Sequence, residues 1–237
     1  MRINKYLSQA GVCSRREADR LIKEKRVSIN GEICGLGDAV KETDRVICDG
    51  IPVVPEDVSK ERVILCYNKP PGLICSTSNI DGETVFDRID YPKRLFYAGR
   101  LDKASRGLLI LTDDGDLANR LMKSKNGHER EYIVTCDTKV SDEMIKAFRK
   151  GVYIPDLEVK TRPCFVKRTD EKEFSIVLTQ GLNRQIRRMC ELYGVHVTDL
   201  CRVRVENVLL GKLKEGTYRR IKGEERLELL RSVGYGC

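Results

Sequence analysis

The sequence predicts an α+β protein in two parts, a small N-terminal unit and a larger domain built on a mixed, largely antiparallel sheet. Apolar, β-branched runs that indicate strands are mixed with helical patterns, without the regular strand–helix alternation of a parallel sheet. Residues 55–61 are polar and poor in core residues, which is typical of a linker. The 237 residues leave room for two domains, which we place at 1–58 and 59–237.

Residues 1–58 are expected to begin with two helices. Apolar residues recur at helical spacing over 3–10, and Gly11 can end that helix. Ser14 and Glu17 fit a capping box, in which each side chain satisfies a free backbone donor at the start of a second helix. Short β-prone runs then predict strands with tight turns at Asn30-Gly31 and Asp49-Gly50.

Positive charge is concentrated in those two helices. Residues 1–26 hold eight basic and three acidic residues, whereas residues 27–58 hold two basic and seven acidic ones. A basic helix pair can lay Arg and Lys side chains along a phosphate backbone. The formal net charge of +8 for the whole chain also favours a polyanionic partner such as RNA. The alternative is an ordinary solvated helix face, but the uneven split favours RNA binding.

The larger domain is expected to contain strands and helices in irregular order. The segment 68–72 predicts a turn, because its prolines set the backbone angles and its glycine permits positive φ. Apolar or alternating residues predict strands over 62–67, 73–76, 95–97, 108–111, 128–135 (a loop and strand), 174–179 and 200–210. Helical spacing and capping residues predict helices over 116–124, 141–151, 183–193 and 224–232.

Two groups of residues could suggest metal binding. Asp113, Asp114 and Asp116 precede a predicted helix, where capping and the helix dipole explain acidic side chains more simply. The ten cysteines are scattered without a Cys-x-x-Cys pair, and the two histidines are far apart in sequence. We therefore expect reduced core cysteines and no metal site.

Several functional classes are disfavoured. The chain lacks the phosphate-binding G-x-x-x-x-G-K-[ST] pattern, a helix-opening G-x-G-x-x-G and the G-x-S-x-G nucleophile elbow. No apolar run approaches the roughly 20 residues of a membrane span, and the first residues lack the apolar core of a signal peptide. We expect a cytoplasmic protein that needs no cofactor. Nothing in the sequence suggests an obligate dimer, so a monomer is expected.

Asp102 is a single carboxylate on a polar loop between the apolar runs 95–97 and 108–111. Gly99 and Gly107 bracket the loop and allow backbone angles that other residues resist. A carboxylate on a loop between rigid elements is a common way of presenting a catalytic group. On these residues alone, an ordinary surface Asp in a turn is slightly favoured.

A second informative stretch, residues 180–189, is basic. On the expected helix, Arg184 and Arg188 share an exposed face, and Arg187 lies beside them. Residues 181–220 hold nine basic and four acidic residues, so the positive charge of the chain clusters here as well.

The first unit resembles the S-four domain, a small RNA-binding domain named after a ribosomal small-subunit protein. The resemblance is carried by residues 2–7 (RINKYL), 11–18 (GVCSRREA) and 26–31 (RVSING). It implies that the two helices and the hairpin contact structured RNA.

The larger domain resembles the pseudouridine synthases, specifically the RsuA-like group that modifies ribosomal RNA. The matching motifs occur in family order, at 68–72 (NKPPG), 99–108 (GRLDKASRGL), 131–132 (EY) and 181–189 (GLNRQIRRM). Residues 128–132 and 183–190 are most similar to the RluF branch, which acts on large-subunit RNA.

This resemblance implies an isomerisation without a cofactor, in which a uridine in RNA is detached from its ribose, rotated and rejoined through carbon. It places the catalytic carboxylate at Asp102, acting as a nucleophile on ribose or base, or as a base that abstracts a ribose proton. It implies that Tyr132 stacks on the uracil and assists proton transfer. It also implies that Arg187 pairs with Asp102 and holds it ionised. Without the family context, Tyr132 reads as a core aromatic and Arg187 as a solvated helix residue.

A uracil inside a helix cannot be reached, so the target uridine must be flipped out or lie in a loop. Arg100 and Arg106 flank Asp102 and could hold neighbouring phosphates or fill the vacated space. The residues expected to contact RNA are Arg2, Lys5, Arg15, Arg16, Arg100, Arg106, Arg184 and Arg188.

The predicted partner is ribosomal RNA, first of all that of the large subunit, either free or in a ribosome-assembly intermediate. Alternatives are the same chemistry on small-subunit ribosomal RNA or tRNA, or a non-catalytic RNA-binding assembly factor with the same basic surfaces. A pure binding protein does not need a carboxylate facing a polyanion, which argues against the last. A metal-dependent nuclease using Asp102 with the acids of 113–116 is weakened by the helix-cap interpretation.

Overall fold

The structure is a computed structural model that describes residues 1–54, 62–122 and 127–235. The chain divides into two compact units, Met1–Arg62 with Pro92–Arg94, and Val63–Tyr91 with Leu95–Cys237. The predicted linker at 55–61 lies outside the described residues, so the boundary between 58 and 59 stays a prediction. No described helix is long and apolar enough to cross a membrane.

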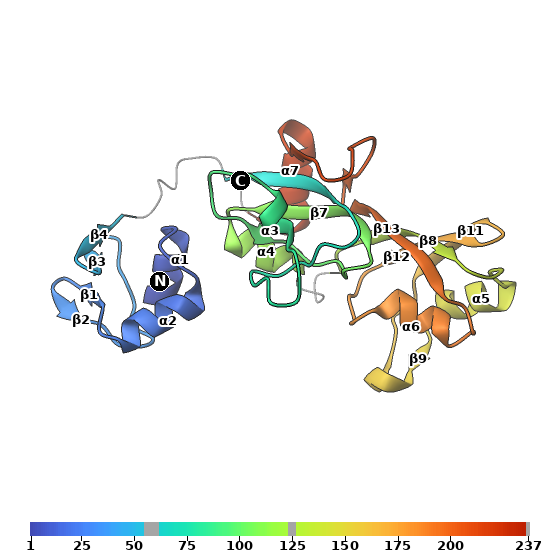
Figure 1. The fold of residues 1–237 in the computed structure, drawn as a ribbon, viewed down its shortest axis with the longest axis horizontal. Helices are drawn as coiled ribbons and strands as arrows, with labels where there is room; N and C mark the ends of the chain where they lie inside the picture. Colours follow the sequence, from blue (N-terminus) through green and yellow to red (C-terminus); the bar gives the residue numbers. More distant parts are fainter. Residues whose placement is uncertain (55–61, 123–126, 236–237) are drawn as a thin grey trace. The chain divides into compact units, whose positions relative to one another are not determined.

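The first unit combines two helices with one antiparallel sheet (Figure 1). Helices α1 (Ile3–Gln9) and α2 (Arg15–Lys23) share a core with the sheet that includes Leu7, Leu21 and Val27. The strand order is β2-β1-β3-β4, with β1 at Val27–Ile29, β2 at Glu32–Ile33, β3 at Val46–Cys48 and β4 at Ile51–Val53. Both predicted turns are confirmed, because φ is 54° and 90° at Asn30-Gly31 and 52° and 78° at Asp49-Gly50.

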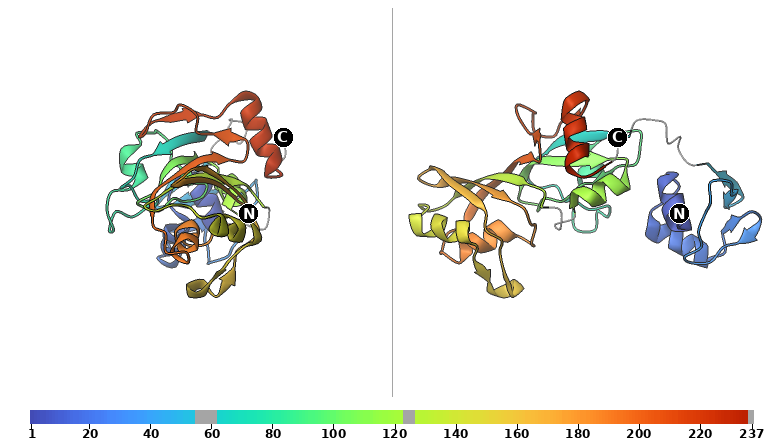
Figure 2. Two further views of the ribbon diagram at one scale, coloured as in Figure 1. Left: turned by 90° about the vertical axis from the view of Figure 1, so that its right-hand side faces the viewer. Right: turned by 180° about the vertical axis from the view of Figure 1, so that it is seen from behind.

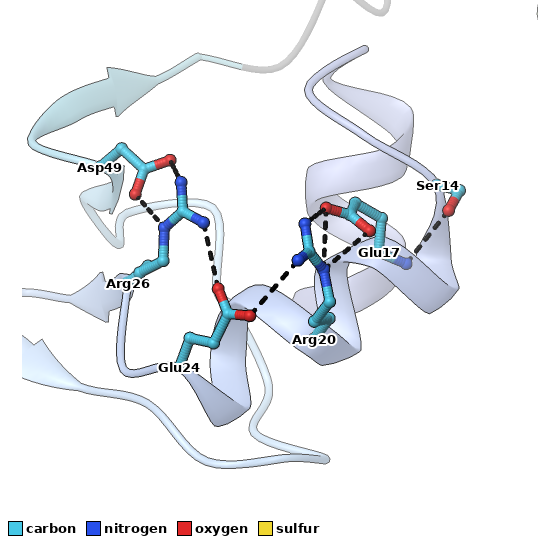
Figure 3. Close-up of polar contacts among 6 residues, drawn as sticks. All are labelled: Ser14, Glu17, Arg20, Glu24, Arg26 and Asp49. Carbon is cyan, nitrogen blue, oxygen red and sulfur yellow. Dashed lines mark hydrogen bonds and ion pairs between the residues drawn. The ribbon is translucent and has the colours of Figure 1, made fainter.

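The predicted capping box at the start of α2 is half formed. Ser14 Oγ accepts a hydrogen bond from the backbone N–H of Glu17 at 3.1 Å, as an N-cap residue should. The Glu17 carboxylate binds the Arg20 guanidinium one turn later instead of returning to the backbone of Ser14 (Figure 3). Residues three apart on a helix are neighbours, so the Arg20 guanidinium is within reach of the Glu17 carboxylate and takes it up as an ion pair.

The second unit is built on a nine-stranded sheet that is mixed and largely antiparallel, as predicted. Its main path is β11-β12-β8-β13-β7-β5-β15, with β14 beside β13 and β6 beside β7. Among the described strands, β13 and β7 run parallel and the other pairs of this sheet are antiparallel. The strands are β5 (Ile64–Lys69), β6 (Phe96–Tyr97), β7 (Arg106–Thr112), β8 (Arg130–Cys136), β11 (Phe165–Asp170), β12 (Glu173–Leu178), β13 (Val197–Val205), β14 (Val208–Leu209) and β15 (Tyr218–Arg220). A separate hairpin pairs β9 (Tyr153–Ile154) with β10 (Val159–Lys160) around the 3-10 turn Pro155–Leu157.

Helices cover different parts of this sheet (Figures 1 and 2). Helices α5 (Asp142–Lys150) and α6 (Gln185–Glu191) share a core with β8, β11 and β12 that includes Phe148 and Phe174. Helices α4 (Gly115–Met122) and α7 (Gly223–Ser232) pack against β5 and β7, and the short α3 (Val85–Arg88) covers the opposite face of these two strands. Successive residues of β7 therefore enter two cores, because strand side chains alternate between faces.

Several predicted elements differ from the structure. The strand predicted over 200–210 is divided into β13 and β14, which pair antiparallel around a turn where Glu206 has φ of 51°. Residues 68 and 69 of the predicted turn belong to β5, and residues 123–124 of the helix predicted over 116–124 lie outside the described residues.

Residues 73–76 form no strand, and Ile74 makes only an isolated bridge to Thr84. The backbone of this segment is bound outside the nine-stranded sheet: the N–H of Gly72 binds the carbonyl of Lys103 at 2.7 Å, and the N–H of Ile74 binds the carbonyl of Glu83 at 2.9 Å. Helix α6 begins at Gln185 rather than at residue 183, since Arg184 adopts a left-handed conformation with φ of 51°.

The helix-cap interpretation of the acidic run is confirmed at Asp114. Its Oδ1 atom accepts hydrogen bonds from the N–H groups of Asp116 and Leu117 at 2.8 and 3.1 Å, at the start of α4. Asp113 instead accepts from the N–H of Val63 at 2.7 Å and ties the start of the unit to the end of β7. Within the described ranges, no group of three or more His, Cys, Asp or Glu residues is arranged to hold a metal ion.

Candidate active site

A cavity of about 440 Å³ opens in the second unit, lined mainly by the loop before β7, by β8 and β13 and by residues between 178 and 186. The register of the strands brings residues of its wall together. The parallel pairing of β13 with β7 places Arg202 beside Gly107, and the antiparallel pairing of β13 with β8 places Arg202 opposite Tyr132. Directly opposed residues share one face of a sheet, so Tyr132 and Arg202 both line the cavity, together with Asp102.

Asp102 is half-buried on the loop between β6 and β7, in the cavity wall. The N–H of Ser105 binds the carbonyl of Asp102 at 3.0 Å, which closes a tight turn just after the carboxylate. The bracketing glycines have φ of +101° at Gly99 and +103° at Gly107, conformations that disfavour other residues. A Cβ atom on Gly107 would lie 2.7 Å from the backbone nitrogen of Arg202, so the close approach of β7 to β13 also requires glycine.

Lys69, at the end of β5, holds the Asp102 loop through its backbone. The side chain is fully buried, and its Nζ donates to the carbonyls of Ser105 at 2.8 Å, Pro70 at 3.0 Å and Lys103 at 3.4 Å. Burial lowers the pKa of the Lys69 ammonium from its ordinary value, while the nearby Cys75 and Asp102 oppose that change. The loop that carries the carboxylate is thus fastened to a buried cation.

Arg187 on α6 reaches the same loop. Its Nη1 donates to the carbonyl of Val197 at 2.8 Å and its Nη2 to the carbonyl of Ala104 at 3.5 Å. Within the described residues, Arg187 forms no ion pair with Asp102, contrary to the expectation from the family resemblance. Two of its donors point instead to backbone carbonyls, that of Val197 on β13 and that of Ala104 in the turn two residues beyond the carboxylate, and Nε has no hydrogen-bond partner among the described residues. Arg187 does not line the cavity.

Arg202 on β13 is the third buried cation of the loop. Its Nε donates to the carbonyl of Leu108 at 2.7 Å, and its Nη1 lies 3.5 Å from the carbonyl of Arg100. Carbonyls before and after Asp102 are therefore bound by Lys69, Arg187 and Arg202, which come from three different elements. In the described part of the chain, none of these three side chains is paired with a carboxylate.

The expected RNA-binding residues near the cavity fall into two groups. Arg100 and Arg184 are exposed and line the cavity. Arg106, by contrast, binds Asp199 through two donors at 3.0 and 2.8 Å and also pairs with Glu215 at 3.4 Å. Arg188 pairs with Asp156 and donates to the carbonyl of Asn183 at 3.2 Å. The charges of Arg106 and Arg188 are thus already compensated by acids that only the fold brings near, which makes them poor candidates for binding phosphate.

The four expected RNA-binding residues of the first unit lie at its two helices. Arg2 is the exposed N-cap residue of α1, Lys5 lies half-buried on that helix, and Arg15 and Arg16 are exposed in the first turn of α2. Two other basic residues of this unit, Arg20 and Arg26, are bound by the carboxylates of Glu17, Glu24 and Asp49 (Figure 3).

Sequence reasoning missed the roles of Lys69, Arg202 and Arg130. Arg130 is also buried, lines the cavity, and donates to the carbonyl of Leu121 at 2.8 Å. Lys69 lies inside the motif at 68–72 that carried the family resemblance. The signal for Arg202 was an arginine between apolar residues in a predicted strand, a position where a charge is expected to be buried and bound.

Comparison with known proteins gives consistent matches in both units. Residues 63–192 match the family described as RNA pseudouridylate synthase, and residues 1–46 match the S4 domain, the S-four domain of the sequence analysis. The chain is 42% identical over 232 residues to the dual-specificity RNA pseudouridine synthase RluF of Salmonella typhi, covering 98% of this chain and 79% of that protein. It is 37% identical over 222 residues to the ribosomal large subunit pseudouridine synthase B of Yersinia pestis, covering 89% of this chain and 69% of that protein. A crystal structure of a pseudouridylate synthase superposes with a TM-score of 0.71 at 29% identity, covering 97% of this chain and 99% of that one.

Proposed function

The chain belongs to the RNA pseudouridylate synthase family, and from this membership we infer that it isomerises uridine in RNA to pseudouridine at the cavity that contains Asp102. The reaction breaks the bond between N1 of uracil and C1′ of ribose and forms a bond from C5 to C1′. No atom is added and nothing is oxidised, so the protein has to bind, orient and move protons.

The placement of Asp102 is the observation that carries this proposal. A half-buried carboxylate lies in a cavity whose volume is within the usual range for small-molecule sites, roughly 300–1,000 Å³. Its loop is fixed by buried cations on both sides, which gives the pre-organised geometry that catalysis requires. Asp102 acts either as a nucleophile on the ribose or base, or as the base that removes a ribose proton.

Tyr132 is the proposed partner of the base. It stands on β8 with its side chain in the cavity wall and is partly packed against the core of α5 and α6. An aromatic ring in this position can stack on a uracil that has been flipped out of its helix, and its hydroxyl can assist proton transfer. Arg100 and Arg184, exposed at the same cavity, are placed to hold phosphates next to the flipped nucleotide.

We propose ribosomal RNA of the large subunit as the substrate, bound with the help of the first unit. Support comes from the relatives named for the large subunit and from the S4 match of residues 1–46. Small-subunit ribosomal RNA and tRNA stay alternative substrates, because the name of the RluF relatives states a dual specificity for RNA without saying which RNAs. A monomer working in the cytoplasm fits this proposal.

Mapping of pseudouridine tests the reaction. Ribosomal RNA is incubated with the protein, treated with carbodiimide and read by primer extension, with and without a chelator. We expect modification by the wild type that survives the chelator, no modification by Asp102→Asn, and normal modification by Asp170→Asn, which changes an exposed carboxylate on β11. Modification by Asp102→Asn at the normal rate would overturn the role of Asp102. RNA binding without modification by the wild type would favour the assembly factor, and cleavage that needs metal would favour the nuclease.

A deletion tests the first unit. A chain lacking residues 1–58 should bind ribosomal RNA more weakly or modify other sites, since the exposed arginines of that unit are lost. Unchanged affinity together with unchanged site choice would refute the role given to the unit.

A further inference from the structure

Among the described residues, Arg202 is the largest whose side chain is fully buried, with an exposed fraction of 1%. It shares the cavity wall with Asp102 and Tyr132. Charged side chains are seldom fully buried without a charged partner, because a charge loses its hydration inside a protein. A buried arginine at this place therefore needs an explanation.

The hydrogen bonds of Arg202 leave the guanidinium only partly satisfied. Nε has a short bond to the carbonyl of Leu108, and Nη1 lies at the limiting distance of 3.5 Å from the carbonyl of Arg100. Nη2 is buried and has no hydrogen-bond partner among residues 1–54, 62–122 and 127–235. An unmade hydrogen bond of a buried charged group is costly, so packing alone would be served better by an apolar side chain of similar volume.

The electrostatic surroundings increase this cost. Arg130, another buried cation of the cavity, has its pKa lowered chiefly by burial and further by the charge of Arg202. Lys69 holds the other side of the Asp102 loop and is also fully buried. Asp102 is the only carboxylate among the described residues that line this cavity.

We propose that Arg202 is a positioning residue for the isomerisation, which fixes the Asp102 loop onto the strand that pairs with that of Tyr132 and provides buried positive charge in the wall of the cavity that Asp102 also lines. This proposal rests on the proposed function. Its side chain binds the backbone on both sides of Asp102, in the loop at Arg100 and on β7 at Leu108. Its own backbone pairs with the strand opposite Tyr132. Arg202 thus sets the distance between carboxylate and aromatic ring, and it takes no part in making or breaking bonds.

Two substitutions separate the contribution of the Arg202 charge from that of its hydrogen bonds to the backbone. Arg202→Met keeps a long side chain but removes charge and donors, whereas Arg202→Lys keeps the charge but cannot reach both carbonyls. The control is Arg149→Met on α5. Among the described residues the Arg149 guanidinium binds a backbone carbonyl, that of Val166 at 3.0 and 2.8 Å, but Arg149 is exposed and does not line the cavity.

The test measures pseudouridine formation in single turnover at saturating ribosomal RNA, and separately the dissociation constant of the RNA by filter binding. We expect Arg202→Met to form pseudouridine roughly 100-fold more slowly, the effect of a small misplacement of reacting groups. Arg202→Lys should recover about tenfold of this loss because charge is restored. RNA affinity should stay within about twofold of the wild type for both, since Arg202 is buried. The control should equal the wild type in rate and affinity.

Three results would overturn the proposal: a normal rate in Arg202→Met, an equal rate in Arg202→Lys and Arg202→Met, or a loss that lies in RNA affinity while the saturated rate is kept. If Arg202→Met does not fold by circular dichroism, Arg202→Lys decides alone, through a slower saturated rate at unchanged affinity. A wild type that forms no pseudouridine would instead refute the proposed function.

Discussion

The Nη2 atom of Arg187 lies 3.5 Å from the carbonyl oxygen of Ala104, and through this contact helix α6 reaches the loop of Asp102. The stronger bond of the same side chain goes to the carbonyl of Val197 on β13, at 2.8 Å. Arg187 therefore joins a helix, a strand and the loop through backbone atoms. The position of the carboxylate depends on these backbone restraints rather than on an ion pair.

Replacing Arg187 should weaken both the loop and the fold. Arg187→Met leaves the carbonyl of Val197 without its donor, and we expect a decrease in the free energy of unfolding of about 1–3 kcal/mol in urea titration. The saturated rate of pseudouridine formation should fall roughly 100-fold, because the turn after Asp102 is released. Arg231→Met, at an exposed position of α7, serves as the control and should leave both values unchanged. An undiminished rate in Arg187→Met would show that the restraint is dispensable.

The two glycines of the loop should differ in their tolerance of a methyl group. Gly107→Ala places a Cβ against the backbone of Arg202, whereas at Gly99 the nearest atom is the end of the Arg202 side chain, 3.9 Å away. Both positions have positive φ and share a strain of about 1–3 kcal/mol, but only Gly107→Ala also forces β7 away from β13. Thermal unfolding should therefore show a clearly larger loss of stability for Gly107→Ala. Equal losses would contradict the steric argument.

Arginines of the first unit should contribute unequally to RNA binding. Arg15 and Arg16 are exposed and have no carboxylate partner among residues 1–54, whereas Arg20 is bound by Glu17 and Glu24. Arg15→Ala combined with Arg16→Ala should lower RNA affinity and reduce the slope of log K against log salt by about 2, the contribution of two phosphate contacts. Arg20→Ala should change the slope much less. The measurement is filter binding between 50 and 200 mM salt, concentrations at which such contacts weaken strongly. A larger effect of Arg20→Ala would reverse the assignment.

Stability should fall at alkaline pH through Cys66 on β5. Burial raises the pKa of this thiol from 9.0 to about 11. Between these values the unfolded chain releases the proton and the folded chain keeps it, so the free energy of unfolding decreases as the pH rises, by at most about 1.4 kcal/mol per pH unit. Urea unfolding of the wild type and Cys66→Ala at pH 8, 9, 10 and 11 should show a smaller decrease in the variant. Parallel decreases would exclude this thiol as the source.

Local patterns in the sequence were sufficient for much of the fold. The Asx-Gly turns, the Ser14 cap and the capping acid Asp114 follow from interactions within a few residues, and each is present in the structure. The loop of Asp102 could also be located, since two apolar runs and two glycines define it without reference to distant residues. The proposed chemistry came from motifs in family order.

Tertiary structure alone decided which charges surround Asp102. Arg202 meets the carbonyl of Leu108 across 94 residues of sequence, and Arg106 meets Asp199 across 93. Sequence analysis could count these charges, but it could not tell that Arg202 is buried in the cavity wall while Arg106 is compensated by an acid. The physical reason is that burial and pairing depend on strand register, here the parallel alignment of β13 with β7, which brings together residues that share no local pattern.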